Sequence, residues 1–501
     1  MEKKGILKNI GFVTAGQIAV LGLALIVPRF ILTGYGSDTN GLLSTVAQIM
    51  SYMAMLEAGI GQATRNELYR YIHGKTLDRE NISRVMAVSR DSYRRMTKIY
   101  FLCILVLAAV LPLIIKTDLD YLTVFLVTLI EGTSGVITFY FIRNHTNLLA
   151  VDGKQYINSN IDLLYKVMIY SVKILIALSG IDIVFMELGF LAATIVILII
   201  YRSYMQKRYG WVDYGCDVTG IKLRDRNPYI ITEVAWTVFF ATDAIVLSVF
   251  CSTKTASVYA IYSMVFIAIN RVTDAIFTGL KYNLGQLYHD DVEKYKKTHD
   301  LFNSVFIGAV SSLLAVAFYL CIPFVTLYTS GISDVDYIDR ALPLGFCLVY
   351  LLSWYRMVAE HLNGIAGYAK KVSRVSLIEV CINLVLSVSL VSFFGIRGVL
   401  YATVAALPVK VIYCNLLADR VILKRGCGKT VRILFTNLIL FASLCFIRNC
   451  IDLRIDSFGS LVLYGVILTS CSVLLFFTAN VIANNDLWRC LRSFFTKRKK
   501  A

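Results

Sequence analysis

Long runs of apolar residues follow one another along most of this 501-residue chain, and short polar segments separate them. A helix needs about 20 mostly apolar residues to cross the hydrocarbon core of a bilayer, and many of the runs reach this length. The pattern predicts spans at 6–30, 41–63, 98–115, 121–142, 158–179, 182–202, 229–250, 256–279, 300–323, 341–362, 375–394, 397–418, 433–448 and 458–482. We therefore expect an all-α polytopic membrane protein with about 14 transmembrane helices.

The two halves of this pattern resemble each other. Four residues at and beyond the end of the fourth span, His145, Asn147, Ala150 and Lys154, recur with the same spacing at and beyond the end of the tenth as His361, Asn363, Ala366 and Lys370. An internal repeat of six helices is typical of transporters whose substrate passes between two lobes. The repeat predicts an N-terminal lobe over 1–205, a cytoplasmic linker over 206–228 and a C-terminal lobe over 229–420. Two further helices and a basic tail would occupy 421–501.

The distribution of charge predicts the orientation. Hydrophobic residues make up 57% of the chain and charged residues 17%, with a net charge of +17. Most Lys and Arg lie in the loops after even-numbered spans, above all in 65–97, which is the longest predicted loop, and in the tail 497–500. Because such loops stay cytoplasmic, both termini are expected inside. The basic excess would then meet anionic lipid headgroups, and without a soluble basic face a nucleic-acid partner is excluded.

No pattern of catalytic or metal-binding residues is present. The 12 cysteines are scattered, lie mostly within the predicted spans and form no C-x-x-C pair. They are therefore expected to be packing residues rather than metal ligands or disulfides. The chain has no P-loop, no G-x-S-x-G turn and no H-E-x-x-H motif, and its five histidines are isolated. We expect no enzyme activity, no cofactor and no metal centre.

Ionisable residues inside the predicted spans are the candidate functional residues, because each costs about 2.5–3.5 kcal/mol at the bilayer centre unless it is paired or hydrated. Three acid–base pairs are spaced three or four residues apart on one helix, so the two charges of each pair can neutralise each other. They are Arg271 with Asp274, Arg356 with Glu360, and Asp162 with Lys166. No such partner is available to Arg29, Lys173, Lys410, Glu57, Glu131 and Asp243. So many charges predict a wet cavity between the lobes.

The basic members of this set suit an anionic cargo, and the arginine fork in particular suits phosphate. We take Arg29, Arg271, Lys173 and Lys410 as candidate substrate-binding residues. The candidate coupling or cavity charges are Glu57, Asp243 and Asp274, with a proton or Na⁺ as the coupling ion. The mixed sign of the charges leaves open a cationic substrate held by Glu57 and Asp243.

Several short segments carry a family resemblance. In the first half they are Pro28-Arg29-Phe30-Ile31-Leu32, Asn40-Gly41-Leu42-Leu43 and Leu56-Glu57-Ala58-Gly59-Ile60-Gly61. In the second half they are Thr242-Asp243-Ala244-Ile245 and Ser257-Val258-Tyr259-Ala260. These segments resemble polysaccharide flippases of the multidrug/oligosaccharidyl-lipid/polysaccharide (MOP) superfamily. The resemblance implies two six-helix bundles with two extra helices, in the bacterial plasma (inner) membrane.

The resemblance also implies a function. The cargo would be an undecaprenyl-pyrophosphate-linked oligosaccharide, moved from the inner to the outer leaflet by alternating access for a surface polysaccharide such as O-antigen. Arg29 and Arg271 would bind its pyrophosphate, and polysaccharide polymerase machinery could be a partner. A multidrug or organic-cation antiporter of the same fold is the alternative. Short external loops count against a membrane polymerase or ligase, and the intramembrane charges count against a purely structural protein.

Overall fold

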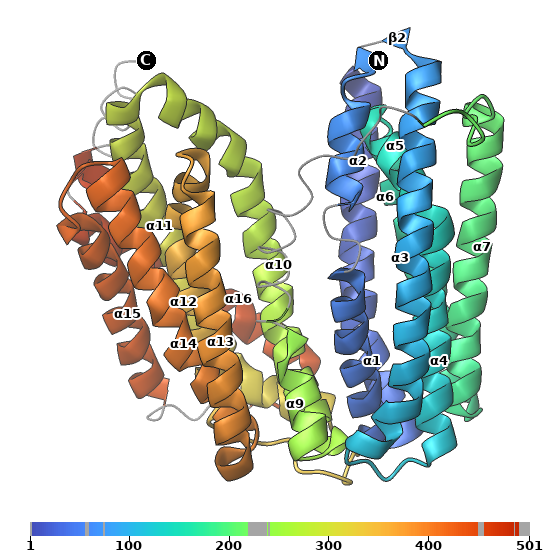
Figure 1. Cartoon of the computed structure of the whole chain (residues 1–501). Helices are drawn as coiled ribbons and strands as arrows, with labels where there is room; N and C mark the ends of the chain where they lie inside the picture. Colours follow the sequence, from blue (N-terminus) through green and yellow to red (C-terminus); the bar gives the residue numbers. More distant parts are fainter. Residues whose placement is uncertain are drawn as a thin grey trace. The chain divides into compact units, whose positions relative to one another are not determined.

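The computed structural model describes residues 3–55, 60–73, 76–218, 238, 241–448, 455–484 and 486–489, apart from the side chains of residues 3–19, 21 and 282. Its regular elements are helices, together with one short β-hairpin (Figure 1). The chain divides into two compact units. The first comprises Met1–Ser257 and Gly331–Val335, and the second comprises Val258–Ser330 and Asp336–Ala501.

The helices follow the order of the chain, from blue to red in Figure 1. The first unit contains α1 (Lys3–Ala54), α2 (Ile60–Leu68), α3 (Arg79–Ile114), α4 (Tyr121–Ile137), the π-helical turn η2 (Thr138–Ile142), α5 (Arg143–Val151), α6 (Gln155–Ser179), α7 (Ile183–Tyr209) and α9 (Asp243–Phe250). From α10 (Thr253–Asp290) the chain enters the second unit, with α11 (Val292–Tyr328), α12 (Leu342–Ile365), α13 (Ala369–Phe394), α14 (Ile396–Leu416), the π-helical turn η3 (Leu417–Ile422), α15 (Gly428–Arg448) and α16 (Phe458–Ala483).

Within the described residues, ten helical segments are long and apolar enough to cross a membrane. They are α3, the run from α4 to Val151, α7, α10, α11, α12, α13, the run from α14 to Ile422, α15 and α16. The spans predicted at 6–30, 41–63, 158–179 and 229–250 are not among the ten. Most of 229–250, and the linker predicted from residue 219 onward, lie outside the described residues. The described part of the chain is thus almost entirely helical, with the many long apolar helices of a multi-pass membrane protein.

The break between the first two predicted spans is a kink in α1. Gly36 has φ 82° and ψ 178°, a backbone conformation that is essentially restricted to glycine. Polar contacts hold the residues that follow. The amide and hydroxyl of Ser37 donate to the Asp334 carboxylate at 2.7 and 2.6 Å, and Asp38 accepts the amide of Asp118 at 2.6 Å. The kink is therefore fixed by its neighbours as well as by glycine.

The predicted loop 65–97 was wrong in its secondary structure, because most of it is helical. After α2 the chain forms a tight hairpin, β1 (Ile72–His73) paired antiparallel with β2 (Thr76–Leu77). Asp78 then caps α3, and its carboxylate accepts the Asn81 amide at 3.2 Å. The charge of this segment predicts that it lies outside the hydrocarbon core, but charged residues do not stop a helix. A well-capped helix with exposed basic residues extends beyond the apolar run.

Each unit has its own apolar core. One cluster in the first unit joins α2, α3, α5, α6 and α7 through Leu68, Val85, Met86, Leu148, Leu149, Ile161 and Ile197. A cluster in the second unit joins α10, α11, α12 and α14 through Leu284, Tyr295, Ala359, Leu362 and Cys414. By contrast, α15 and α16 keep many large apolar side chains exposed, including Phe435, Ile439, Val462, Leu463 and Val466. Those surfaces suit contact with lipid.

Candidate functional site

A cavity of about 420 Å³ lies within the first unit among α2, η2, α5, α6 and α7. Much of its wall is made of charged, amide and hydroxyl groups, contributed by Arg65, Thr138, Arg143, Thr146, Asn147, Gln155, Asn158, Ser159, Asp162, Tyr165, Thr194 and Tyr201. One edge is the π-helical turn η2, and such turns are frequent at functional sites. A polar cavity inside a mostly apolar helix bundle is a candidate binding site.

Arg65, at the last turn of α2, is held in place by neutral groups. Its guanidinium donates to the side-chain oxygens of Asn147 and Gln62, both at 2.8 Å. The amide of Asn147 in turn donates to the Tyr93 hydroxyl at 3.0 Å. In the part of the chain that the structure describes, no carboxylate pairs with Arg65, so its positive charge is oriented but not neutralised. Such a guanidinium is well suited to bind an anion.

Two further charged residues line the same cavity. Arg143 begins α5 directly after the π-helical turn, with its guanidinium carbon 5.8 Å from the centre of the Phe139 ring. Asp162 forms an ion pair with Lys166 at 2.6 Å, as the i,i+4 spacing predicted. The charged side chains of the wall are thus two arginines and one acid, and that acid is paired with a lysine. The cavity therefore favours a negatively charged occupant.

Neutral polar groups complete the wall. The Asn158 amide donates to the Thr146 carbonyl at 3.0 Å, and the Asn158 oxygen accepts the Tyr201 hydroxyl at 3.3 Å. The hydroxyls of Tyr165 and Thr194 are hydrogen-bonded at 2.9 Å. Side chains of this kind can exchange these bonds for bonds to the hydroxyls of a bound molecule, which is how polar groups fix the orientation of a ligand.

Lys173 belongs to a mostly buried charged group that links α6 and α7. Its ammonium lies 3.1 Å from the Glu187 carboxylate, whose side chain has no exposed surface, and 5.3 Å from the centre of the Phe190 ring. Glu131 of α4 lies close enough to interact electrostatically with both charged partners. The group contains two acids and one base, so a single bound proton would make it neutral. This composition suits exchange of a proton or another small cation.

Lys410 belongs to a second buried group, within the second unit. Its ammonium lies 2.7 Å from Glu360, and the Arg356 guanidinium contacts both Glu379 and Glu360, the latter at 3.6 Å. The same-helix pair of Arg356 and Glu360 is thereby confirmed, whereas Glu379 and Lys410 join from α13 and α14. Two acids balance two bases, so this group is neutral without any ligand.

The other predicted residues lie elsewhere. Arg29 is partly buried in α1, and its carbonyl accepts the Thr33 hydroxyl at 3.0 Å. Arg271 and Asp274 are both exposed on α10, and among the described residues they form no ion pair with each other. Asp243 is buried at the start of α9. Glu57 lies outside the described residues.

Sequence reasoning missed two of the arginines and one acid. Arg65 and Arg143 were counted only as basic residues on the cytoplasmic side, and Glu187 was not singled out. The signal available for Arg65 was indirect. Asn147, which accepts its hydrogen bond, is one of the residues that recur in the second half. For Glu187 the signal was a carboxylate within a predicted span at 182–202 that also lay near Lys173 in the chain.

Comparison of the whole chain with known proteins gives a consistent fold. No protein-family model and no curated protein sequence matches it. Among solved structures it is similar to the lipid II flippase MurJ in an inward closed conformation, with a TM-score of 0.68 and 14% identity over 93% of this chain and 99% of that chain. It is also similar to an inward-facing multidrug resistance MATE family transporter of the MOP superfamily, with a TM-score of 0.61 and 14% identity over 85% and 95% of the two chains.

A third similar structure is a MOP superfamily transporter from Pyrococcus furiosus, described as having a binding pocket of reverse polarity. The TM-score is 0.53, with 16% identity over 83% of this chain and 96% of that chain. These likenesses show that the chain has the fold of MOP superfamily transporters.

Proposed function

We propose that this protein is a flippase that moves a polyprenyl-pyrophosphate-linked oligosaccharide from the inner to the outer leaflet of the bacterial plasma membrane, for surface polysaccharide synthesis. The observation that carries the proposal is the cavity of the first unit, which combines two arginines with a wall of amides and hydroxyls. An amphiphile with an anionic linker and a hydroxyl-rich head needs both kinds of group at once.

The arginines would recognise the pyrophosphate. A planar guanidinium gives two parallel donors to a phosphate, and charge-assisted bonds are roughly twice as strong as neutral ones. Arg65 is pre-oriented by Asn147 and Gln62, so less conformational entropy is lost when an anion binds. Arg65 and Arg143 line this cavity, whereas Lys173 and Lys410 belong to charged groups of their own. We therefore assign the first contact to Arg65 and Arg143, and a supporting one to Arg29.

The neutral wall would recognise the sugars. Asn158 donates to the Thr146 carbonyl and accepts from the Tyr201 hydroxyl, so its amide and the hydroxyl are groups that could bond to a sugar hydroxyl instead. The site would be exposed alternately to the two sides of the membrane. Coupling of transport to a proton would use the acid surplus at Glu131 and Glu187.

Depletion in the host tests the proposal. Loss of the protein should cause a pyrophosphate-linked oligosaccharide to accumulate while surface glycan falls, and the wild type should restore both. Arg65→Ala should fail to restore them. The matched control is Arg202→Ala, since Arg202 is an exposed arginine on α7 outside the cavity wall. Unchanged surface glycan and unchanged lipid-linked precursors would contradict the proposal.

The acid surplus at Glu131 and Glu187 favours one other function, export of organic cations in exchange for protons. A cationic drug would then be the cargo, and the cavity arginines would repel it. Ethidium accumulation separates the two functions. A flippase leaves ethidium levels unchanged when the protein is removed, whereas an antiporter lets them rise, and Glu187→Gln then has the same effect as removal.

A further inference from the structure

A rigid polar network lies at one end of the second unit, around Asp300 of α11. Arg425, in the segment between η3 and α15, binds the Asp300 carboxylate with two nitrogens at 2.7 and 2.9 Å and reaches Asp419 at 2.8 Å. Asn484, just after α16, donates to the Asp300 carbonyl at 3.3 Å. Since Asp300 is 1% exposed, this network fixes the ends of α11, α15 and α16 to one another.

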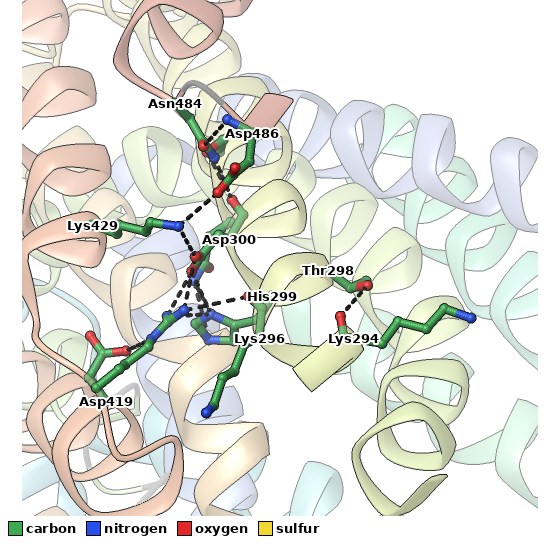
Figure 2. Close-up of polar contacts among 12 residues, drawn as sticks. Lys294, Lys296, Thr298, His299, Asp300, Asp419, Lys429, Asn484 and Asp486 are labelled. Carbon is green, nitrogen blue, oxygen red and sulfur yellow. Dashed lines mark hydrogen bonds and ion pairs between the residues drawn. The ribbon is translucent and has the colours of Figure 1, made fainter. Parts of the chain in front are cut away.

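Lys429 extends from this network toward the surface. Figure 2 shows its ammonium between Asp300 and Asp486, and the distances are 3.6 and 2.7 Å. Its side chain nevertheless keeps 58% of its surface exposed. The base is therefore held in position by two carboxylates on one side and is open to a ligand on the other.

A cavity of about 230 Å³ lies beside Lys429, between the start of α15 and the segment after α16. Its wall includes Lys429, Arg432, Ile433, Asn484, Asp486 and Arg489. Three bases face one acid. The guanidinium of Arg489 is 4.0 Å from Asp486, its side chain is 81% exposed, and Arg432 is exposed as well. The cavity also lies at the start of a helix, where the first backbone amides favour an anion.

The surroundings of the cavity are typical of a site at the level of lipid headgroups. The helices α15 and α16 are long and apolar enough to span a membrane, and much of their apolar surface is exposed. Trp488, beside Arg489, is 57% exposed, and an exposed indole next to a base is typical of the membrane interface. The basic loops predict that this end is cytoplasmic, where anionic lipids attract juxtamembrane bases.

We propose that this cavity binds the phosphate of an anionic phospholipid of the cytoplasmic leaflet. Lys429, Arg432 and Arg489 would hold the phosphate, and the acyl chains would lie along the exposed apolar surface of α15 and α16. The bound lipid would join the ends of these helices to the Asp300 network. The site requires that α15 and α16 lie in a membrane, and it does not depend on the cargo.

Native mass spectrometry of the full-length protein tests this site. The probes are phosphatidylglycerol, zwitterionic phosphatidylcholine and inorganic phosphate, each titrated into purified protein. The variants are Arg432→Gln/Arg489→Gln and the control Arg420→Gln, which removes an exposed base of η3 outside the cavity. We expect the double variant to bind phosphatidylglycerol about thirty-fold more weakly, because each base near the surface contributes about a factor of five.

The control should bind phosphatidylglycerol as the wild type does, and phosphatidylcholine should bind weakly to all three proteins. Equal phosphatidylglycerol binding by the wild type and the double variant would overturn the site. Binding of inorganic phosphate as strong as that of the lipid would overturn the lipid assignment, because it would identify the ligand as a free phosphate. Thermal unfolding of each variant without lipid confirms that the protein is folded, since the substituted side chains are exposed.

Discussion

Replacing Arg356 with methionine removes a base that lies between two acids. Arg356 is 1% exposed, and its guanidinium contacts Glu379 on α13 and Glu360 on its own helix. Lys410 lies beside Glu360 at 2.7 Å. With Arg356 gone, one ammonium remains for two carboxylates. Glu379, with 3% of its side chain exposed, then keeps a buried charge with its closest base removed.

Breaking a buried ion pair from one side costs about 3–5 kcal/mol of unfolding free energy, because the other charge stays buried. Removing both charges avoids that cost. We therefore expect Arg356→Met to lose about 3–5 kcal/mol and Arg356→Met/Glu379→Leu to lose at most about 1 kcal/mol. In the double variant Glu360 and Lys410 still form their own pair. The matched control is Arg397→Met, because the Arg397 side chain is 51% exposed and binds Asp339 at the surface.

The assay is unfolding in mixed micelles of increasing dodecyl sulfate content, with tryptophan fluorescence as the readout. Trp354 is buried on the same helix as Arg356 and donates to the Asn270 side chain at 3.0 Å, so it reports on this region. The reasoning is refuted if Arg356→Met loses no more stability than Arg397→Met. It is also refuted if the double variant is as unstable as Arg356→Met alone.

Two further substitutions test local features of the fold. Gly36→Ala should cost about 1–3 kcal/mol of unfolding free energy, because alanine is strained at φ 82° and ψ 178°. The control Gly22→Ala lies in a helix with open space at the new methyl group, so it should not destabilise the protein in the same unfolding titration. Asn480→Ala should cost about 0.6–1.7 kcal/mol, because Asn437 and Asn480 exchange buried amide bonds of 3.0 and 2.9 Å between α15 and α16; a loss near zero would contradict this.

The helical spans could be predicted because the bilayer requires long apolar runs, and ten of the expected spans fall on helices suited to cross it. Helix ends could not be predicted in the same way. α11 begins at Val292, before the expected span at 300–323, since exposed charged residues such as Lys294 are tolerated in a helix outside the hydrocarbon core. The break at Gly36 was visible only as a gap between two apolar runs.

Pairs of charged residues could likewise be predicted only where both partners lie on one helix. The pair of Asp162 and Lys166 was predictable from its spacing on one helix, and the structure contains it. The pair of Lys173 and Glu187 joins two helices, so its formation depends on tertiary packing that the spacing does not encode. Arg65 was counted only among the basic loop residues that predict the orientation of the chain in the membrane. Its charge fits that prediction whether or not its side chain lines a cavity. The composition of a segment gives the sign of its net charge, but it does not give the direction in which a side chain points.

Translocation in proteoliposomes tests the central claim most directly. A fluorescent short-chain polyprenyl-pyrophosphate oligosaccharide would be placed in one leaflet, and its appearance in the other measured with a membrane-impermeant quencher. We expect the wild type and Arg202→Ala to flip the lipid at equal rates and Arg65→Ala to flip it about ten-fold or more slowly, because it loses a charge-assisted bond to the pyrophosphate. A wild-type rate equal to that of protein-free liposomes, or an unchanged rate in Arg65→Ala, would contradict the account.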